Sequence, residues 1–153
     1  MDDADKRILY WLQRDASMPL AELADKTGLS VSPCWRRVQR LTEAGVIRAR
    51  VALLDPASVN LGVDVFVSVR TSLHKKEWSD AFNACVMAIP EVVGFYRMAG
   101  DVDYLLHIVV PDIAGYDRVY KRLIERIDLH DVSASFAMQT IKSTTALPLD
   151  YVR

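Results

Sequence analysis

Residues 29–47 read LSVSPCWRRVQRLTEAGVI, and this stretch decides the fold of the first third of the chain. Its apolar side chains recur at the spacing of one helical face: Cys34, Val38 and Leu41. Ser32 suits the cap of such a helix, Pro33 suits its first turn, and Gly45 suits its end. We therefore predict a helix that runs from about Ser32 to Ala44.

The opposite face of this helix is basic. Arg36 and Arg40 lie one turn apart on it, with Arg37 beside them. Arginines on an exposed helix face bind guanine edges or phosphates in a major groove, although on many helices they only face solvent. The predicted DNA contacts also include the start of the helix and a flanking arginine; the full set is Ser30, Ser32, Pro33, Arg36, Arg37, Arg40 and Arg48.

Two shorter helices are predicted before this one. An apolar stripe defines the first, at Ile8, Leu9 and Leu12, and early aspartates favour its positive end. Pro19 suits the start of the second, and Gly28 provides the tight turn before the third. Three helices with this turn predict a helix-turn-helix. Residues 46–47 and 50–54 look extended and would form its wing and a hinge strand.

Two side chains on the third helix leave alternatives open. Trp35 either packs at the edge of the small domain, which we favour, or lies against a sugar-phosphate backbone. Cys34 has arginine neighbours near a helix start, which lower a thiol pKa, but its helical phase points inward and predicts a core thiol.

After residue 62 the periodicity changes to β-α-β-β-α-β, the ferredoxin-like order. The predicted strands and helices are residues 63–70, 76–89, 92–98, 104–110, 112–127 and 132–142. The fold class is thus α+β, with a winged helix-turn-helix over 1–50, a hinge strand and linker over 51–62, and the ferredoxin-like domain over 63–153. One sheet face lacks helices and is rich in apolar residues, so we expect a homodimer formed sheet to sheet.

The charges are distributed unevenly. The whole chain of 153 residues has a net charge of only −1, which by itself argues against DNA binding. Residues 30–50, however, hold five arginines against the single Glu43. This basic segment points to double-stranded DNA as a partner, whereas the rest of the chain is acidic.

A turn in the second domain has the chemistry to hold an amino acid. In Gly100-Asp101-Val102-Asp103, glycine allows a ligand to approach the backbone, exposed amides accept a carboxylate, and an aspartate pairs with an ammonium group. Gly and Asp are also common in ordinary turns, so a plain β-turn between adjacent strands remains the alternative.

Several motifs together resemble one family. The helix motif of residues 29–47, the hinge-like 53–56, the loop 100–106 and the tail 144–149 resemble the Lrp/AsnC (feast/famine) transcription regulators, in the same order along nearly the whole chain. The resemblance implies an amino-acid effector of unknown identity, no cofactor, and dimers that often assemble into octamers. It also implies the effector-binding residues Gly100, Asp101, Val102, Asp103 and Tyr104, with Ala137 and Gln139 from a neighbouring subunit.

The competing interpretation is an amino-acid sensor or enzyme that does not bind DNA, because ferredoxin-like domains host both functions. The histidines His74, His107 and His130 are widely spaced and match no metal motif, and no nucleophile elbow or phosphate loop is present. We therefore expect no enzyme, no catalytic residue and no metal site. The acidic start and the short apolar runs predict a cytoplasmic chain without a membrane partner.

Overall fold

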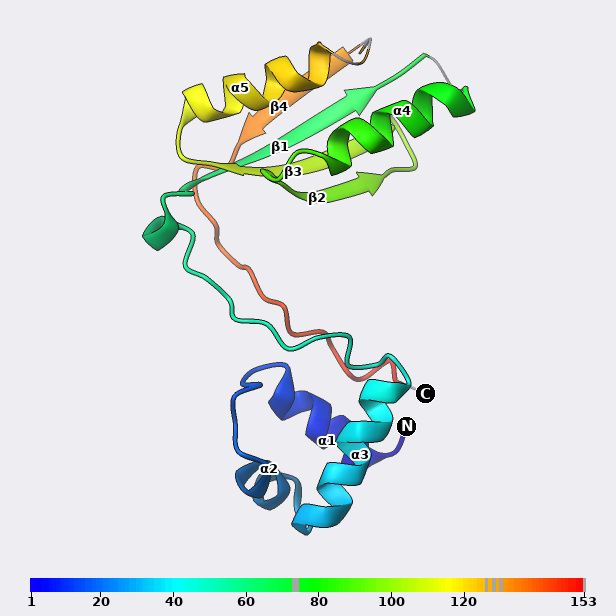
Figure 1. Cartoon of the computed structure of the whole chain (residues 1–153), viewed down its shortest axis with the longest axis vertical. Helices are drawn as coiled ribbons and strands as arrows, with labels where there is room; N and C mark the ends of the chain where they lie inside the picture. The colour runs from blue at the N-terminus through cyan, green and yellow to red at the C-terminus, as the bar shows by residue number, and fades with distance from the viewer. Residues whose placement is uncertain (73–74, 126, 128, 130, 153) are drawn as a thin grey trace. The chain divides into compact units, whose positions relative to one another are not determined.

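The computed structural model describes the chain apart from residues 73, 74, 126, 128, 130 and 153, so His74 and His130 lie outside the described residues. The chain forms two compact units, Met1–Leu53 together with Ile141–Arg153, and Leu54–Thr140 (Figure 1). The tail after residue 140 thus groups with the first unit, whereas the sequence analysis had assigned it to the second domain.

The first unit contains the three expected helices, which are α1 (Asp3–Leu12), α2 (Leu20–Thr27) and α3 (Val31–Glu43). Asp2 caps α1 in a capping box, because its carboxylate accepts from the Asp5 amide and the Asp5 carboxylate accepts from the Asp2 amide. α3 begins one residue earlier than predicted, with Ser30 rather than Ser32 as its N-cap. Pro33 is tolerated there because amides of the first helical turn have no intrahelical partner.

The turn between α2 and α3 is a glycine turn. Gly28 has φ +69° and ψ +33°, a left-handed conformation that glycine adopts without a Cβ clash. Its amide donates to the carbonyls of Ala24 and Asp25, and the Leu29 amide also reaches the Ala24 carbonyl. These bonds satisfy the end of α2 and reverse the chain into α3, so the predicted helix-turn-helix is confirmed.

The three helices enclose a small core of buried side chains: Ile8, Leu12, Leu23, Ala24, Cys34, Val38 and Leu41. The C-terminal tail adds a contact from outside this core. The side-chain amide of Gln13 donates to the Leu147 carbonyl (3.0 Å) and accepts from the Leu147 amide (2.9 Å). This two-way bond ties the tail to the end of α1.

The expected wing strand is not formed. The chain between α3 and residue 63 contains no strand, and only the short 3-10 helix η1 (Ala57–Val59) interrupts it. Val51, Leu53 and Leu54 are largely exposed, so an extended segment here has neither a partner strand nor a packed face. Isolated extended segments of this kind are not stable as β-structure, so neither the predicted wing nor the predicted hinge strand is present as a strand within the described single chain.

The second unit has the predicted ferredoxin-like order. Its elements are β1 (Val63–Arg70), α4 (Lys76–Met87), β2 (Val92–Arg97), β3 (Tyr104–Val110), α5 (Ile113–Ile124) and β4 (Asp131–Phe136). The strands form one antiparallel sheet in the order β2-β3-β1-β4. Asp112 caps α5, since its carboxylate accepts from the Gly115 amide (2.7 Å).

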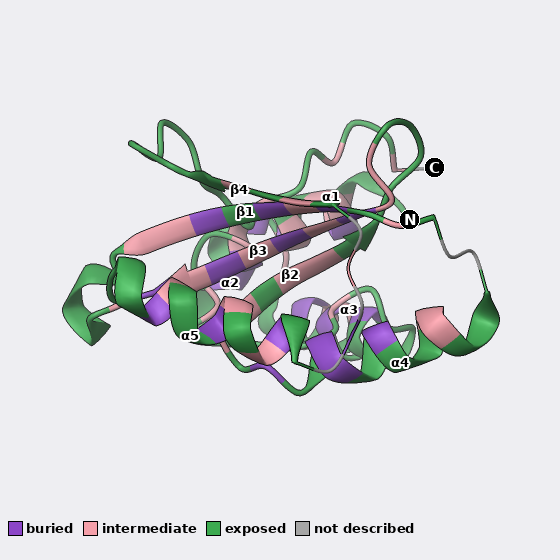
Figure 2. Cartoon of the chain, turned by 90° about the horizontal axis from the view of Figure 1, so that it is seen from above, coloured by how far each residue is buried: buried purple, intermediate pink, exposed green. Residues whose placement is uncertain are grey.

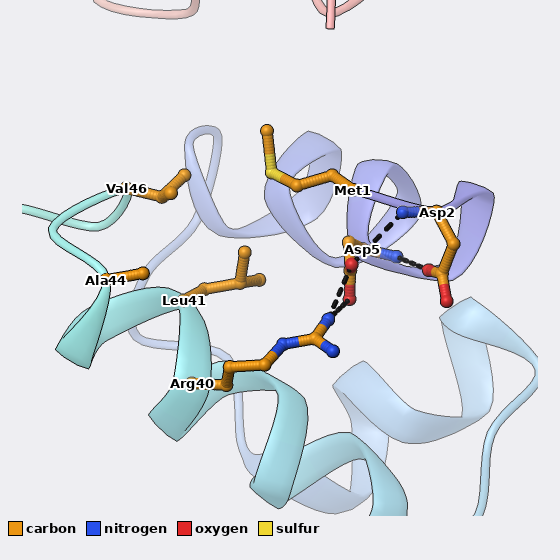
Figure 3. A pocket seen from close by; sticks show the side chains of 7 residues that line it. All are labelled: Met1, Asp2, Asp5, Arg40, Leu41, Ala44 and Val46. Atoms are coloured by element: carbon orange, nitrogen blue, oxygen red, sulfur yellow. Dashed lines mark hydrogen bonds and ion pairs between the residues drawn. The ribbon is translucent and has the colours of Figure 1, made fainter. Parts of the chain in front are cut away.

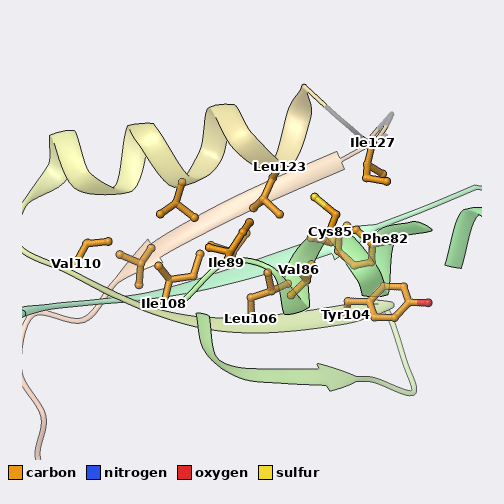
Figure 4. Close-up of a cluster of buried hydrophobic side chains, with 14 residues drawn as sticks. Phe82, Cys85, Val86, Ile89, Tyr104, Leu106, Ile108, Val110, Leu123 and Ile127 are labelled. Atoms are coloured by element: carbon orange, nitrogen blue, oxygen red, sulfur yellow. The ribbon is translucent and has the colours of Figure 1, made fainter. Parts of the chain in front are cut away.

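Both helices cover the same face of this sheet. Alternate residues of β1 and β3 are buried, as the purple bands in Figure 2 show. They meet apolar side chains of α4 and α5 in the main core (Figure 4), which contains Val65, Val67, Val69, Phe82, Cys85, Val86, Ile89, Tyr104, Leu106, Ile108, Val110, Val119, Leu123 and Ile127. The core therefore fixes which strand residues face the helices and which face away.

The other sheet face is mixed rather than uniformly apolar. Phe66 is partly exposed there and stacks on the His107 ring at 4.7 Å, and His107 Nε2 lies 2.6 Å from an Asp64 carboxylate oxygen. β4 ends at Phe136, earlier than predicted. Phe136 pairs with Val65, and only two residues of β1 precede Val65, so β1 offers no partner for the end of the predicted strand. Neither α4 nor α5 covers this face.

Candidate nucleic-acid interface and effector site

Two arginines of α3 are held by carboxylates of α1. Asp5, whose side chain is only 1% exposed, accepts from Arg37 Nη1 (2.8 Å) and from Arg40 Nη2 (2.6 and 2.7 Å). Asp2 accepts from the same Arg37 nitrogen at 2.6 Å. Figure 3 shows the Arg40 side chain reaching from α3 toward the Asp5 carboxylate at the start of α1. We call Asp2, Asp5, Arg37 and Arg40 the carboxylate–arginine cluster.

Hydrogen bonds and opposite charges in this cluster favour the charged forms of Asp2 and Arg37. The Asp5 amide, followed by the Arg37 side chain, holds the pKa of Asp2 at about 2. Hydrogen bonds from Arg37 to Asp2 and Asp5 raise the pKa of the Arg37 guanidinium. From the sequence, the aspartates indicate only the start of α1. Their three-residue spacing signals a capping box, but nothing in the sequence pairs them with arginines more than 30 residues away.

Arg36 differs from its two neighbours. It is exposed and forms no ion pair with any residue that the structure describes. It lines an open hollow of about 490 Å³ with four other residues, which are Leu20, Val31, Ser32 and Trp35. Trp35 is 51% exposed, so our preference for a packed tryptophan was wrong. Its helical position places it one turn after Val31, away from the Cys34 stripe that is buried.

The other predicted DNA contacts are also on the surface. Ser30, Ser32 and Arg48 are exposed, and Pro33 is half-buried. Ser30 caps α3 through its backbone, and its hydroxyl makes no capping bond. The start of α3 therefore presents two exposed serines, of which Ser32 shares the hollow with Arg36, whereas Arg37 and Arg40 extend toward α1.

Cys34 and His107, two residues considered for catalysis, both lie in surroundings that indicate a structural role. Cys34 is fully buried, and burial raises the pKa of its thiol, contrary to the behaviour of a reactive cysteine. His107 is part of the open sheet face and contacts Asp64 and Phe66. Within the described part of the chain, no three His, Cys, Asp or Glu side chains are placed to hold a metal ion.

The loop of residues 100–104 is closed by its own backbone. Gly100 has φ +125°, a conformation that side chains other than glycine's rarely allow. The Met98 amide donates to the Asp103 carbonyl (2.8 Å), and the Asp103 amide donates to the Val69 carbonyl (3.1 Å). The Asp103 carboxylate accepts from the Thr71 amide (2.8 Å), so it serves the loop's own structure.

Arg70, at the end of β1, is a residue of this loop site that sequence reasoning missed. Its Nε donates to the Asp101 carbonyl (2.8 Å), and its Nη1 lies 3.3 Å from the Asp131 carboxylate. The Asp101 carboxylate itself has no hydrogen-bond or ion-pair partner among the described residues, and the same holds for the amides of residues 100–102. The loop thus presents an exposed carboxylate, amides and a guanidinium together.

Three predicted effector residues are not part of this exposed surface. Tyr104 is buried in the core, where its ring lies 5.0 Å from Phe82 and its hydroxyl is 2.9 Å from the Ser79 hydroxyl. Its side chain is therefore not available at the loop surface in this structure. Ala137 and Gln139 follow β4 near the Val65 end of β1, whereas the loop adjoins its Val69 end, so one chain does not bring these segments together.

A helix-turn-helix with an exposed basic face, joined to a ferredoxin-like domain with a polar loop site, defines a two-domain regulator that binds DNA and a small ligand. Comparison with known families gives the same answer. Residues 1–48 match the winged helix-turn-helix DNA-binding family, and residues 64–147 match the Lrp/AsnC ligand binding domain. The chain belongs to the Lrp/AsnC family of transcriptional regulators, and the family is one of regulators rather than enzymes.

Several relatives match over nearly the full length. The chain is 51% identical to the glutamate uptake regulatory protein of Zymomonas mobilis, over 97% of this chain and 91% of the relative. It is 44% identical to the DNA-binding transcriptional activator DecR of Escherichia coli, over 98% and 99% of the two chains. The expected fold class and the function as a DNA-binding transcriptional regulator are thereby confirmed.

Solved structures agree with this assignment. An AsnC family transcriptional regulator from Agrobacterium tumefaciens is 59% identical, covers 100% of both chains and has a TM-score of 0.97. A transcriptional regulator from Neisseria meningitidis, solved as a complex with L-Met, is 36% identical over 100% of this chain and 99% of that one, with a TM-score of 0.95. No helix in the described part of this chain has the length and apolarity of a membrane span.

Proposed function

We propose that this regulator binds the major groove of double-stranded DNA through the start of α3. Arg36 carries the direct contact, Ser30, Ser32 and Pro33 set the register, and Arg48 approaches the flanking backbone. Arg37 and Arg40, whose charges Asp2 and Asp5 balance, offer guanidinium hydrogen-bond donors to the phosphates in an orientation that the two carboxylates hold. The observation that supports this most is the exposed Arg36, which has no ion-pair partner in the described chain.

We also propose that the second domain responds to a free amino acid at the loop of residues 100–104. The amides of Gly100, Asp101 and Val102 suit a carboxylate, and Arg70 strengthens that site. The exposed Asp101 carboxylate suits the ammonium group. Asp103 and Tyr104 act by shaping the loop, through the Thr71 amide and the aromatic core respectively.

The assembly is proposed as a homodimer that joins the open sheet faces, with octamers formed from four dimers. Phe66, Tyr96 and the stacked His107 offer a partly apolar surface for such a contact. Ala137 and Gln139 would then reach the effector loop of a neighbouring subunit, as they do not reach their own. As a regulator of transcription, the protein would act in the cytoplasm.

We propose that amino-acid binding changes DNA affinity by changing how the dimers assemble. An effector changes DNA binding only if it has a different affinity for two assembly states. The L-Met complex of the Neisseria relative makes amino acids the first ligands to test. The space available beside the loop of residues 100–104 for the side chain of the bound amino acid would determine which amino acid this chain prefers.

A thermal-shift screen of the twenty amino acids against the full chain tests the effector part, because a ligand that binds only the folded state raises the melting temperature. We expect one amino acid or a small group to do so, and we expect Asp101→Asn to abolish the shift. Glu125→Gln, an exposed carboxylate beyond the end of α5, is the matched control and should keep it. A shift that persists in Asp101→Asn would remove this carboxylate from the site.

A further inference from the structure

The arginine face of α3 is divided into two parts. Arg37 and Arg40 belong to the carboxylate–arginine cluster, in which Asp5 is almost fully buried. Their guanidinium groups are oriented along the α1 side of the helix. The surface left for reading bases is therefore the start of α3, around Arg36. What else this surface presents determines what sequence it recognises.

Large apolar side chains occupy that surface beside the arginine. Val31 is 47% exposed and Trp35 is 51% exposed, and both line the hollow that Arg36 and Ser32 also line. They are four residues apart on α3, so they form one row along the helix. Ser32 and Arg36 form the adjacent row at the same spacing. An apolar row thus lies next to a polar row on one edge.

We propose that Val31 and Trp35 are specificity-determining residues that contact the C5 methyl groups of thymine, next to a guanine bound by Arg36. The thymine methyl is the apolar group that unmodified base pairs present in the major groove, and aliphatic or aromatic side chains recognise it by contact. This inference rests on the DNA-binding face proposed above. The inference adds Val31 and Trp35 to the DNA-binding face. Both are uncharged, and in this role neither forms a hydrogen bond with a base.

The spacing of the two rows is compatible with adjacent base pairs. One helical turn advances about 5.4 Å, which spans between one and two steps of about 3.4 Å along a DNA strand. A row of Val31 and Trp35 therefore covers neighbouring thymines, while Arg36 reaches the guanine of a nearby pair. The positive charge of Arg36 and the net positive charge of residues 30–50 favour DNA over a protein as the occupant of this hollow.

The test uses a duplex enriched from a random pool by the full-length wild-type protein. Thymines of that duplex are then replaced one at a time by uracil, which removes only the methyl group. We expect one or two positions at which this replacement weakens binding by about fourfold per methyl. Val31→Ala and Trp35→Ala are each expected to weaken binding to the thymine duplex and to lose the thymine-over-uracil preference at one of those positions.

Two further variants separate this role from general damage. Arg36→Gln should keep the thymine-over-uracil preference while its overall affinity falls. Tyr10→Ala removes an exposed aromatic side chain of α1 in the same unit and should keep both properties. Uracil replacements that change affinity less than about twofold everywhere would overturn the proposal, as would a thymine preference that survives in both Val31→Ala and Trp35→Ala. Trp35→Ala with wild-type affinity would also overturn it and point to a protein partner instead, whereas failure to enrich any duplex would refute the DNA-binding face itself.

Discussion

The carboxylate–arginine cluster makes the stability of the first unit depend on a single buried carboxylate. Asp5→Asn keeps the shape of this side chain but removes its negative charge and one acceptor oxygen. Arg40 then loses its ion-pair partner, Arg37 keeps only Asp2, and the capping bond to the Asp2 amide is weakened. The substitution therefore tests whether the cluster holds α1 against α3.

The magnitude follows from the exposure of the partners. Removing one member of a fully buried ion pair costs about 3–5 kcal/mol. Here Asp5 is 1% exposed, but the side chains of Arg37 and Arg40 are 28% and 59% exposed, so water recovers part of their solvation. Hydrogen bonds to charged groups of this kind contribute about 1.5–3 kcal/mol. We expect the free energy of unfolding of the first unit to fall by about 2 kcal/mol.

Urea unfolding followed by tryptophan fluorescence measures this effect. A Trp78→Phe background leaves Trp11 and Trp35, both in the first unit, as the reporters. Asp3→Asn is the matched control, because Asp3 is an exposed carboxylate of the same helical turn and should change stability by no more than about 0.5 kcal/mol. If Asp5→Asn is no more destabilising than Asp3→Asn, the cluster does not support the domain and the reasoning is refuted.

Three other predictions concern the same unit. The pKa of Asp2 is about 2 in the folded chain, against 3.8 in a model peptide, so the unfolded chain binds more protons between those two pH values. The free energy of unfolding therefore falls as the pH drops through this range. In an acid titration, Asp2→Asn should lack this part of the loss. Gly28→Ala should lower the free energy of unfolding by about 1 kcal/mol in the urea assay, because alanine is strained at φ +69°, and an unchanged midpoint would contradict this. Gln13→Ala should speed hydrogen exchange of the Leu147 amide while Gln13→Asn has a smaller effect, and equal protection in all three proteins would show that the side-chain bond does not hold the tail.

Local signals in the sequence were sufficient for the order of elements. The Cys34, Val38 and Leu41 spacing identified the buried stripe of α3, because helical periodicity records burial directly. Glycine turns marked the helix-turn-helix, and alternating apolar residues marked β1 and β3. The predicted wing strand is absent from the single chain for a related reason. Residues 50–54 are apolar enough to suggest a strand, but the sequence does not say whether a partner strand exists.

Contacts between distant residues were beyond such reasoning. The sequence places all three arginines of α3 on its exposed side, and only the packing of α1 on α3 shows that Arg37 and Arg40 are paired with carboxylates whereas Arg36 is not. The same holds for Arg70, which reaches the effector loop because of the register between β1 and β3. The family resemblance implies Tyr104 as an effector residue, but strand alternation turns its ring into the core. These differences change which variants are informative.

The DNA-reading role of α3 is tested by binding of the full-length protein to its enriched duplex, measured over a range of salt concentrations for wild type and Arg36→Gln. Arg14→Gln is the matched control, since Arg14 is an exposed arginine just after the end of α1 whose Nη1 donates to the Tyr10 carbonyl. We predict a steep fall of log affinity with log salt, with a slope of about −0.9 per neutralised phosphate. We also predict a loss of about 10- to 100-fold in Arg36→Gln and near wild-type binding in Arg14→Gln. Affinity that is independent of salt, or an Arg36→Gln variant that binds as wild type does, would contradict the assignment of α3 as the DNA-reading helix.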